Sequence, residues 1–200
     1  MKLYYALGSC STAPRILLAE AGIACEQEVV NLKTHETASG SDFYKINPNG
    51  YVPALVLDDG TLLTEGAAIN QYIADLVPAK KLAPANGTVE RYKLQSWLNF
   101  IATELHKSYS VLFNRNAADD WKADAKAKLA KRYEYVDTAL AKHACLMGDD
   151  FTAADAYLFV VLGWSDFVGV DLSAFPNINA FIERIAARPS VQSVKAADKK

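Results

Sequence analysis

Residues 4–20, YYALGSCSTAPRILLAE, combine the end of an extended apolar segment with the beginning of a helix. The aromatic and apolar run of residues 2–7 is typical of a strand. Apolar side chains at helical spacing over residues 11–22, with Gly22 at the end, predict a helix. The two elements meet at a single cysteine, Cys10. This stretch therefore predicts a strand-turn-helix unit with a thiol at its turn.

The position of Cys10 favours a reactive thiol. Ser11 or Thr12 can cap the helix, so Cys10 lies where unpaired backbone N–H groups converge, and such a site lowers a thiol pKa from about 8.5 toward neutrality. In a thioredoxin-type redox pair a second cysteine follows one turn later, but Ala13 stands at that position. The alternative is a small buried residue at a strand end. A lone thiol here indicates a site that holds or reacts with a soluble thiol.

The first eighty residues predict a small mixed sheet with helices packed on it. Residues 25–32 alternate polar and apolar side chains, which predicts a second strand and completes a β-α-β unit. Two apolar runs within residues 51–65 flank the turn sequence DDG and predict a hairpin. Residues 65–76 then have helical spacing. The order β-α-β followed by β-β-α is typical of an α/β domain, which we place at residues 1–78.

Strand signals disappear after a turn-rich linker at residues 79–87, and residues 88–200 predict an all-helical domain. Amphipathic helices are expected over residues 88–113 and 125–141, with core stripes of Leu94, Trp97, Leu98, Ile101, Leu105, Leu112, Leu129, Tyr133, Val136 and Leu140. Residues 151–164 predict a buried helix that opens with a capping box of Thr152 and Asp155. Residues 178–190 predict a final helix that Pro189 stops.

Composition excludes several classes of protein. The 200 residues are 51% hydrophobic and 22% charged, with a net charge of −2; residues 1–80 carry −4 and residues 81–200 carry +2. Because basic residues are spread along the chain, we expect no nucleic-acid partner. Three cysteines without a CxxC pattern favour a reducing cytoplasm. The apolar segment 151–164 is too short to cross a bilayer, so no membrane partner is expected. No metal-ligand spacing occurs, so no metal is expected.

Two short motifs in the first domain are candidates for ligand binding. If the Val52–Pro53 peptide is cis, the backbone N–H and C=O of Val52 can pair with an extended peptide; a trans proline at a strand edge is the commoner alternative. Glu65 can cap the helix that follows. With the N–H of Gly66 it can also receive the ammonium and carboxylate groups of a ligand, although a plain first-turn acid is the simpler interpretation.

The long predicted helix carries a second candidate face. Asn99 and His106 are seven residues apart, which places them within about 20° of each other on an α-helix. Tyr109 and Phe113 lie near that face, and Trp164 either joins the core or lines a cleft. The alternative for His106 is a surface or core histidine.

The motifs SCS, NPNGYVPALVLDDG, LLTEGAAINQYIAD and FTAADAYLF occur in an order that resembles the cytosolic glutathione transferases, specifically the bacterial beta class, over essentially the whole chain. The resemblance implies a thioredoxin-like first domain, an all-helical second domain, and a homodimer with glutathione as co-substrate in a cleft between domains. It implies catalytic roles for Cys10 and His106. It assigns Val52 with Pro53 to the cysteinyl part of glutathione and Glu65 with Gly66 to the γ-glutamyl part.

Other binding positions implied by the resemblance are Asn99 and Lys107 at the thiol or glycyl end, Glu104 toward the neighbouring subunit's ligand, Lys33 and His35 in the loop for the glycyl carboxylate, and Tyr109, Phe113 and Trp164 around the electrophile. Gly66 departs from the family pattern, which usually has serine there. The departure removes a hydroxyl contact and keeps the backbone N–H.

The implied activity is conjugation of the glutathione thiol to hydrophobic electrophiles, with thiol–disulfide exchange through Cys10 as a second activity. Tyr5, Ser9 and Ser11 are neighbouring hydroxyls that are alternatives to Cys10 for activating the thiol. Two other functions stay open on the same fold. One is a glutathione-dependent disulfide oxidoreductase with Cys10 as nucleophile, and the other is a non-catalytic binding protein.

Overall fold

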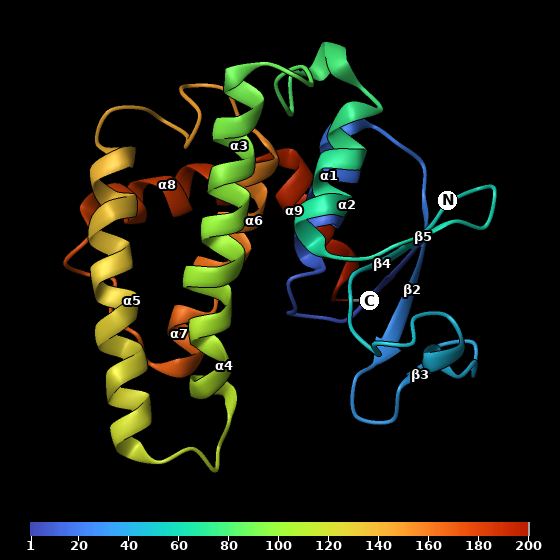
Figure 1. The fold of residues 1–200 in the computed structure, drawn as a ribbon, viewed down its shortest axis with the longest axis horizontal. Coiled ribbons are helices and arrows are strands. Elements are labelled where there is room, and N and C mark those ends of the chain that lie inside the picture. Colours follow the sequence, from blue (N-terminus) through green and yellow to red (C-terminus); the bar gives the residue numbers. More distant parts are fainter. Residues whose placement is uncertain (200) are drawn as a thin grey trace. The chain divides into compact units, whose positions relative to one another are not determined.

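The computed structural model describes residues 1–199 and divides the chain into two compact units. The first unit comprises Met1–Ala83 and the end of the chain from Pro189 onward, and the second comprises Pro84–Arg188. Within the described residues, every strand belongs to the first unit, and the second unit is built from helices (Figure 1). The predicted fold class, an α/β unit followed by a helical one, is confirmed.

The sheet of the first unit has the strand order β3-β2-β1-β4-β5. β1 is parallel to β2, as the predicted β-α-β unit requires, and β4 is antiparallel to β5, as the predicted hairpin requires. β1 also pairs with β4, in the antiparallel direction. The two-residue strand β3 was not predicted, because so short a strand has no periodicity. The strands are β1 Lys2–Tyr5, β2 Glu26–Asn31, β3 Glu36–Thr37, β4 Ala54–Val56 and β5 Leu62–Leu63.

Three α-helices belong to the described part of the first unit: α1 (Thr12–Ala21), α2 (Gly66–Asp75) and α9 (Pro189–Ala197). α1 packs against both α2 and α9. The helix predicted over 178–190 was expected to be the last one, and that expectation is wrong. The preceding helix α8 ends at Ala186, and Pro189 opens a further helix, because proline is well suited to a first helical position. Short helical turns also occur at η1 Phe43–Lys45 and η2 Pro78–Lys80.

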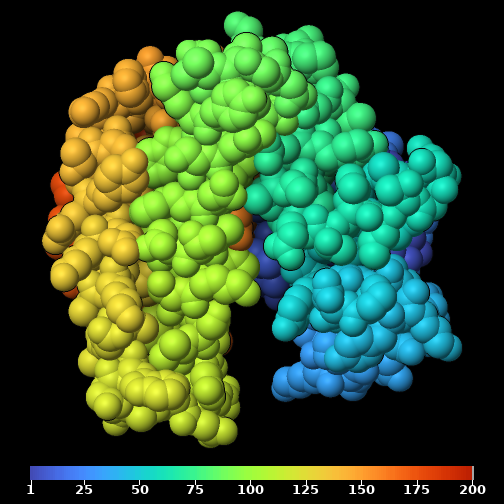
Figure 2. All heavy atoms as spheres, in the orientation of Figure 1, coloured from blue at the N-terminus to red at the C-terminus, as the bar shows by residue number. Residues whose placement is uncertain are grey.

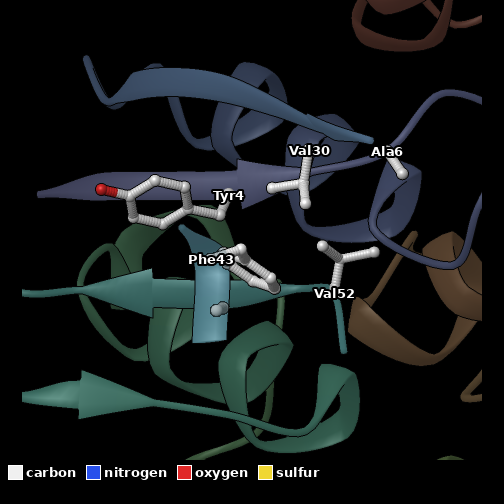
Figure 3. Close-up of a cluster of buried hydrophobic side chains, with 6 residues drawn as sticks. Tyr4, Ala6, Val30, Phe43 and Val52 are labelled. Carbon is white, nitrogen blue, oxygen red and sulfur yellow. The ribbon is translucent and has the colours of Figure 1, made fainter. Parts of the chain in front are cut away.

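A buried cluster fixes the end of β1 beside the segment that precedes β4. The rings of Tyr4 and Phe43 lie 5.7 Å apart, and Val30, Ala6 and Val52 gather at the other end of the cluster (Figure 3). All five side chains are at least nine-tenths buried. The packing therefore holds Ala6, where the Cys10 loop begins, close to Val52.

The second unit packs its helices around α6, as the sequence predicts. Nine of the ten residues of α6 are buried, and Asp155 and Thr152 form the predicted capping box. None of the helices described for residues 1–199 is both long and apolar enough to cross a bilayer. The helical elements are α3 Val89–Phe100, η3 Ile101–His106, α4 Lys107–Phe113, α5 Asp119–Leu140, α6 Ala153–Leu162, α7 Ser165–Val168 and α8 Pro176–Ala186.

The predicted long helix 88–113 is interrupted by a wider turn. Its residues Ile101–His106 adopt a π-helical conformation between α3 and α4. A π-turn bonds residues five apart instead of four, so each residue rotates less about the axis than in an α-helix. The calculated 20° between Asn99 and His106 assumed a continuous α-helix and is therefore wrong.

Candidate functional site

Two serine hydroxyls fold the Cys10 loop back on the end of β1. Ser11 Oγ accepts a hydrogen bond from the N–H of Ala6 at 3.0 Å, and Ser9 Oγ donates one to the carbonyl oxygen of Ala6 at 2.8 Å. Ser11 is fully buried at the N-cap position of α1, yet its side chain makes no capping bond. The cap predicted for Ser11 is wrong, because its hydroxyl shapes the loop instead.

The loop brings Cys10 to Val52. The half-buried thiol of Cys10 donates a hydrogen bond from Sγ to the carbonyl oxygen of Val52 at 3.4 Å. The Val52–Pro53 peptide is cis, which decides between the two alternatives left by the sequence. Within residues 1–199 the backbone N–H of Val52 has no hydrogen-bond partner. A backbone donor and acceptor for an extended ligand therefore lie beside the thiol.

Glu65 and Gly66 form the start of α2 next to this backbone. A Cβ on Gly66 would lie 3.7 Å from Cγ of Pro53, so the two residues are in contact range. Glu65 has a φ of +64°, a conformation that side-chain-bearing residues rarely adopt and that clusters at functional sites. Its carboxylate makes no capping bond, so the predicted cap is wrong, and the side chain is exposed.

The loop after β2 holds Lys33 and His35 in different ways. Lys33 is exposed, and residues 1–199 offer it no ion-pair partner. The ring of His35 lies 4.4 Å from that of Tyr44, and its Nδ1 is buried without a hydrogen bond. A cation in this loop is therefore available at Lys33, whereas His35 packs against its neighbours.

In the second unit, His106 ends the π-helical segment and contacts two aromatic residues. Its Nδ1 lies 2.7 Å from the hydroxyl oxygen of Tyr157, and its ring is 4.8 Å from that of Trp164 at 69°. Burial, with a smaller contribution from the charge of Lys107, lowers the pKa of His106 to about 4. At neutral pH His106 is therefore an uncharged imidazole.

Trp164 joins His106 to an aromatic cluster whose outer edge is exposed. Phe113 is 42% exposed and lies 5.5 Å from Trp164 and 6.2 Å from Phe167, which is 81% exposed. Tyr109 differs from the expectation. It is fully buried, and its hydroxyl bonds to Tyr133 and Ser165, so it supports the cluster from behind rather than lining a surface.

Sequence reasoning missed two members of this cluster, Tyr157 and Phe167. Tyr157 lies in a helix that is apolar apart from its capping residue Asp155, and a lone hydroxyl in such a helix was the available signal. Phe167 follows the predicted buried helix and carried no periodic signal.

The remaining predicted residues of the second unit lie at or near the surface. Asn99 and Lys107 are exposed. Glu104 is half-buried, and its Oε2 accepts a hydrogen bond from Nε of Arg132 at 2.6 Å. Residues 1–199 contain no group of three His, Cys, Asp or Glu side chains that could hold a metal ion.

Two protein-family models match the chain. The glutathione S-transferase N-terminal domain covers residues 1–75, and the glutathione S-transferase C-terminal domain covers residues 100–189. The chain belongs to the glutathione S-transferase family. It is 45% identical over 198 residues to glutathione S-transferase GstA of Escherichia coli O157:H7. The matched region covers 99% of this chain and 98% of the relative.

Solved structures of glutathione S-transferases are similar over the same length. The ternary complex of BphK, a bacterial member, has a TM-score of 0.98 and 52% identity, with full coverage of both chains. The beta-class glutathione S-transferase of Sphingomonas chungbukensis has a TM-score of 0.95 and 44% identity, covering 99% of this chain and 98% of that one. The resemblance to the bacterial beta class, the thioredoxin-like first domain and the assignment as a glutathione transferase are confirmed.

Proposed function

We propose that the chain conjugates the thiol of glutathione to hydrophobic electrophiles and that its first unit binds glutathione as co-substrate. The proposal is carried by the position of Cys10, whose Sγ lies 3.4 Å from the carbonyl oxygen of Val52. The N–H of the same Val52 has no hydrogen-bond partner within residues 1–199. An extended peptide that pairs with Val52 presents its own cysteinyl sulfur to Cys10. A related sphingomonad glutathione S-transferase, 43% identical, was solved in complex with glutathione, which supports the same ligand here.

The two ends of glutathione suit the neighbouring groups. The γ-glutamyl end carries an ammonium, which the exposed carboxylate of Glu65 can bind, and a carboxylate, which suits the first N–H groups of α2 at Gly66. The glycyl carboxylate suits Lys33, whose ammonium has no ion-pair partner in residues 1–199, better than the packed ring of His35. Exposed Asn99 and Lys107 are further candidates for the thiol or glycyl end.

The reaction needs the thiolate form of glutathione, because the thiolate is the nucleophile. Its sulfur attacks an electrophilic carbon, so an S–C bond forms, the leaving group departs with its electron pair, and the thiol proton goes to solvent. Cys10 and His106 are the side chains we propose at the sulfur. Phe113, Phe167 and the edge of Trp164 supply an apolar surface for the electrophile.

The test is binding to immobilised glutathione and turnover with glutathione and 1-chloro-2,4-dinitrobenzene. We expect retention on the column, elution by free glutathione, and chloride release that saturates with glutathione. A protein that passes through the column and shows no turnover would instead be a non-catalytic binding protein.

Cys10 also supports thiol–disulfide exchange as a second activity. Its half-buried Sγ lies next to the proposed ligand sulfur, and none of the cysteines in the described chain forms a disulfide. Attack by the Cys10 thiolate on a mixed disulfide between glutathione and a second thiol RSH would form a Cys10–glutathione disulfide and release RS⁻. A glutathione thiolate would then restore Cys10 and form oxidised glutathione, so glutathione is the reductant.

We further propose a homodimer that uses a groove of about 470 Å³ between α3 and α5. Figure 2 shows this face of the second unit, with α3 in green beside α5 in yellow. Trp97, Phe100 and Tyr135 lie with ring centroids 5.2–5.8 Å apart, and the predicted core residue Trp97 is only half-buried. Three cations line the same groove: Lys93, Lys131 and Arg132, the last of which also binds Glu104.

A groove lined by basic side chains and by half-buried or exposed aromatic side chains suits a second copy whose residues 1–80 carry a net charge of −4. The test is molar mass by light scattering. We expect Trp97→Ala to shift the dimer toward monomer, whereas Trp121→Ala, at an exposed tryptophan of α5 outside the groove, leaves it a dimer.

A cytoplasmic location is also proposed, since a reducing compartment suits three cysteines without disulfides.

A further inference from the structure

His106 is held in one orientation by residues of its own unit. The hydroxyl oxygen of Tyr157, a residue of α6, lies 2.7 Å from Nδ1. The ring of Trp164 packs on the imidazole, with the two ring centroids 4.8 Å apart. Tyr157 is 4% exposed and Trp164 is 9% exposed, so both are fixed by packing. Within residues 1–199 the other ring nitrogen, Nε2, has no hydrogen-bond partner. The ring therefore has one nitrogen anchored and one available to a ligand.

An uncharged imidazole carries its single hydrogen on one nitrogen, and the partner of the other nitrogen decides which. The burial that lowers the pKa of His106 to about 4 keeps the ring uncharged at neutral pH. A phenol hydroxyl is a good hydrogen donor, and an unprotonated imidazole nitrogen is a strong acceptor. When the Tyr157 hydroxyl donates to Nδ1, the ring hydrogen resides on Nε2.

We propose that Tyr157 is a positioning residue that holds His106 in the Nε2–H form, so that His106 donates a hydrogen bond to the glutathione thiolate and does not remove the thiol proton. This rests on the proposed function, which places His106 at the sulfur. In this form Nε2 already carries a hydrogen and Nδ1 is occupied by Tyr157, so the ring has no site for the thiol proton. That proton goes to solvent, and the hydrogen bond stabilises the charge on sulfur.

The tautomer is tested without any substrate. In a long-range proton–nitrogen correlation spectrum at about pH 7, we expect the Nε2 of His106 in the protonated-nitrogen range and its Nδ1 in the unprotonated range. Tyr157→Phe removes the donor and shifts both signals toward the average of the two tautomers. Tyr133→Phe is the matched control, because it removes a buried hydroxyl of the same unit that bonds Tyr109 rather than His106. A hydrogen on Nδ1 in the wild type, or unchanged shifts in Tyr157→Phe, overturns the proposal.

Kinetics separate a donor from a base. The amide nitrogen of glutamine can take the place of Nε2, whereas that of asparagine takes the place of Nδ1, and neither amide is a base. We expect His106→Gln to keep kcat at least about fivefold above His106→Asn, and Tyr157→Phe to lower kcat about 3- to 10-fold with little change in KM for glutathione, as for loss of one hydrogen bond. Equal loss in both His106 variants indicates a base and overturns the proposal.

The proposed function and this inference can fail separately. A protein without turnover contradicts the transferase function, yet its spectrum still reports the tautomer of His106. A protein with full turnover and the Nδ1–H tautomer contradicts only the role of Tyr157.

Discussion

The two units contribute to the proposed site in different ways. The first unit offers mainly backbone: the Val52 peptide, the start of α2, and a loop pinned to Ala6 by two serine hydroxyls. The second unit offers side chains, with His106 held between Tyr157 and Trp164. A backbone site tolerates changes in side-chain size, whereas an aromatic cluster depends on each ring. The first unit also offers the side chains of Cys10, Glu65 and Lys33, and substitutions of Cys10 and Glu65 should have the largest effects.

The largest expected effect is at Cys10. Cys10→Ala should lower glutathione-dependent reduction of a mixed disulfide of glutathione about 100-fold or more, because it removes the attacking sulfur. Conjugation of 1-chloro-2,4-dinitrobenzene should fall much less, since the nucleophile there is the thiol of glutathione. Cys25→Ala, at a half-buried cysteine whose thiol pKa is raised by burial, should change neither rate. Loss of conjugation in Cys10→Ala would mean that Cys10 also activates the thiol.

The next effect tests the charged contact to the γ-glutamyl group. Glu65→Gln keeps the shape and removes the charge, so KM for glutathione should rise about 10- to 100-fold, the usual value of a hydrogen bond to a charged group. Glu36→Gln, at an exposed acid of the same unit, is the control. An unchanged KM would leave ligand recognition in this unit entirely to the backbone.

His106 should give the second unit a distinct pH dependence. Its pKa is about 4 in the folded chain and about 6.5 when unfolded, so acidification protonates the unfolded form first. The free energy of unfolding should therefore fall between about pH 6.5 and pH 4, and this fall should be smaller in His106→Gln. Proton shifts of the His106 ring that move between pH 6 and 7 would contradict the expectation.

The smallest effect is expected at Gly66. A Cβ there meets only Pro53, at ordinary contact distances of 3.7 and 3.8 Å, so a serine fits. Gly66→Ser should lower KM for glutathione about two- to fivefold by restoring a hydroxyl contact. Gly66→Ala, which adds the Cβ alone, separates the hydroxyl from the added bulk. A lower KM in the alanine variant would assign the gain to packing.

Sequence patterns predicted the first unit better than the second because short-range signals specify its parts. The apolar run at residues 2–7, the alternation in residues 25–32 and the DDG turn predicted β1, β2, β4 and β5 but not the two-residue β3. Cys10 lies beside Val52, as the family resemblance implies. Helical spacing in residues 88–113 does not reveal the π-helical turn at Ile101–His106, because no proline or glycine marks it. The burial of Tyr109 depends on Tyr133 and Ser165, which are distant in sequence, so local periodicity could not predict it.

The return of α9 to α1 has a consequence for synthesis on the ribosome. Arg15 is 2% exposed; its guanidinium binds Asp198 at 2.6 Å, and Ser190 donates to Glu20 at 2.6 Å. When residues 1–83 emerge from the exit tunnel, these partners do not yet exist, and α1 keeps an uncovered side. During synthesis, the packing of the first unit therefore stays incomplete on this side of α1 until the helical unit and α9 have been translated.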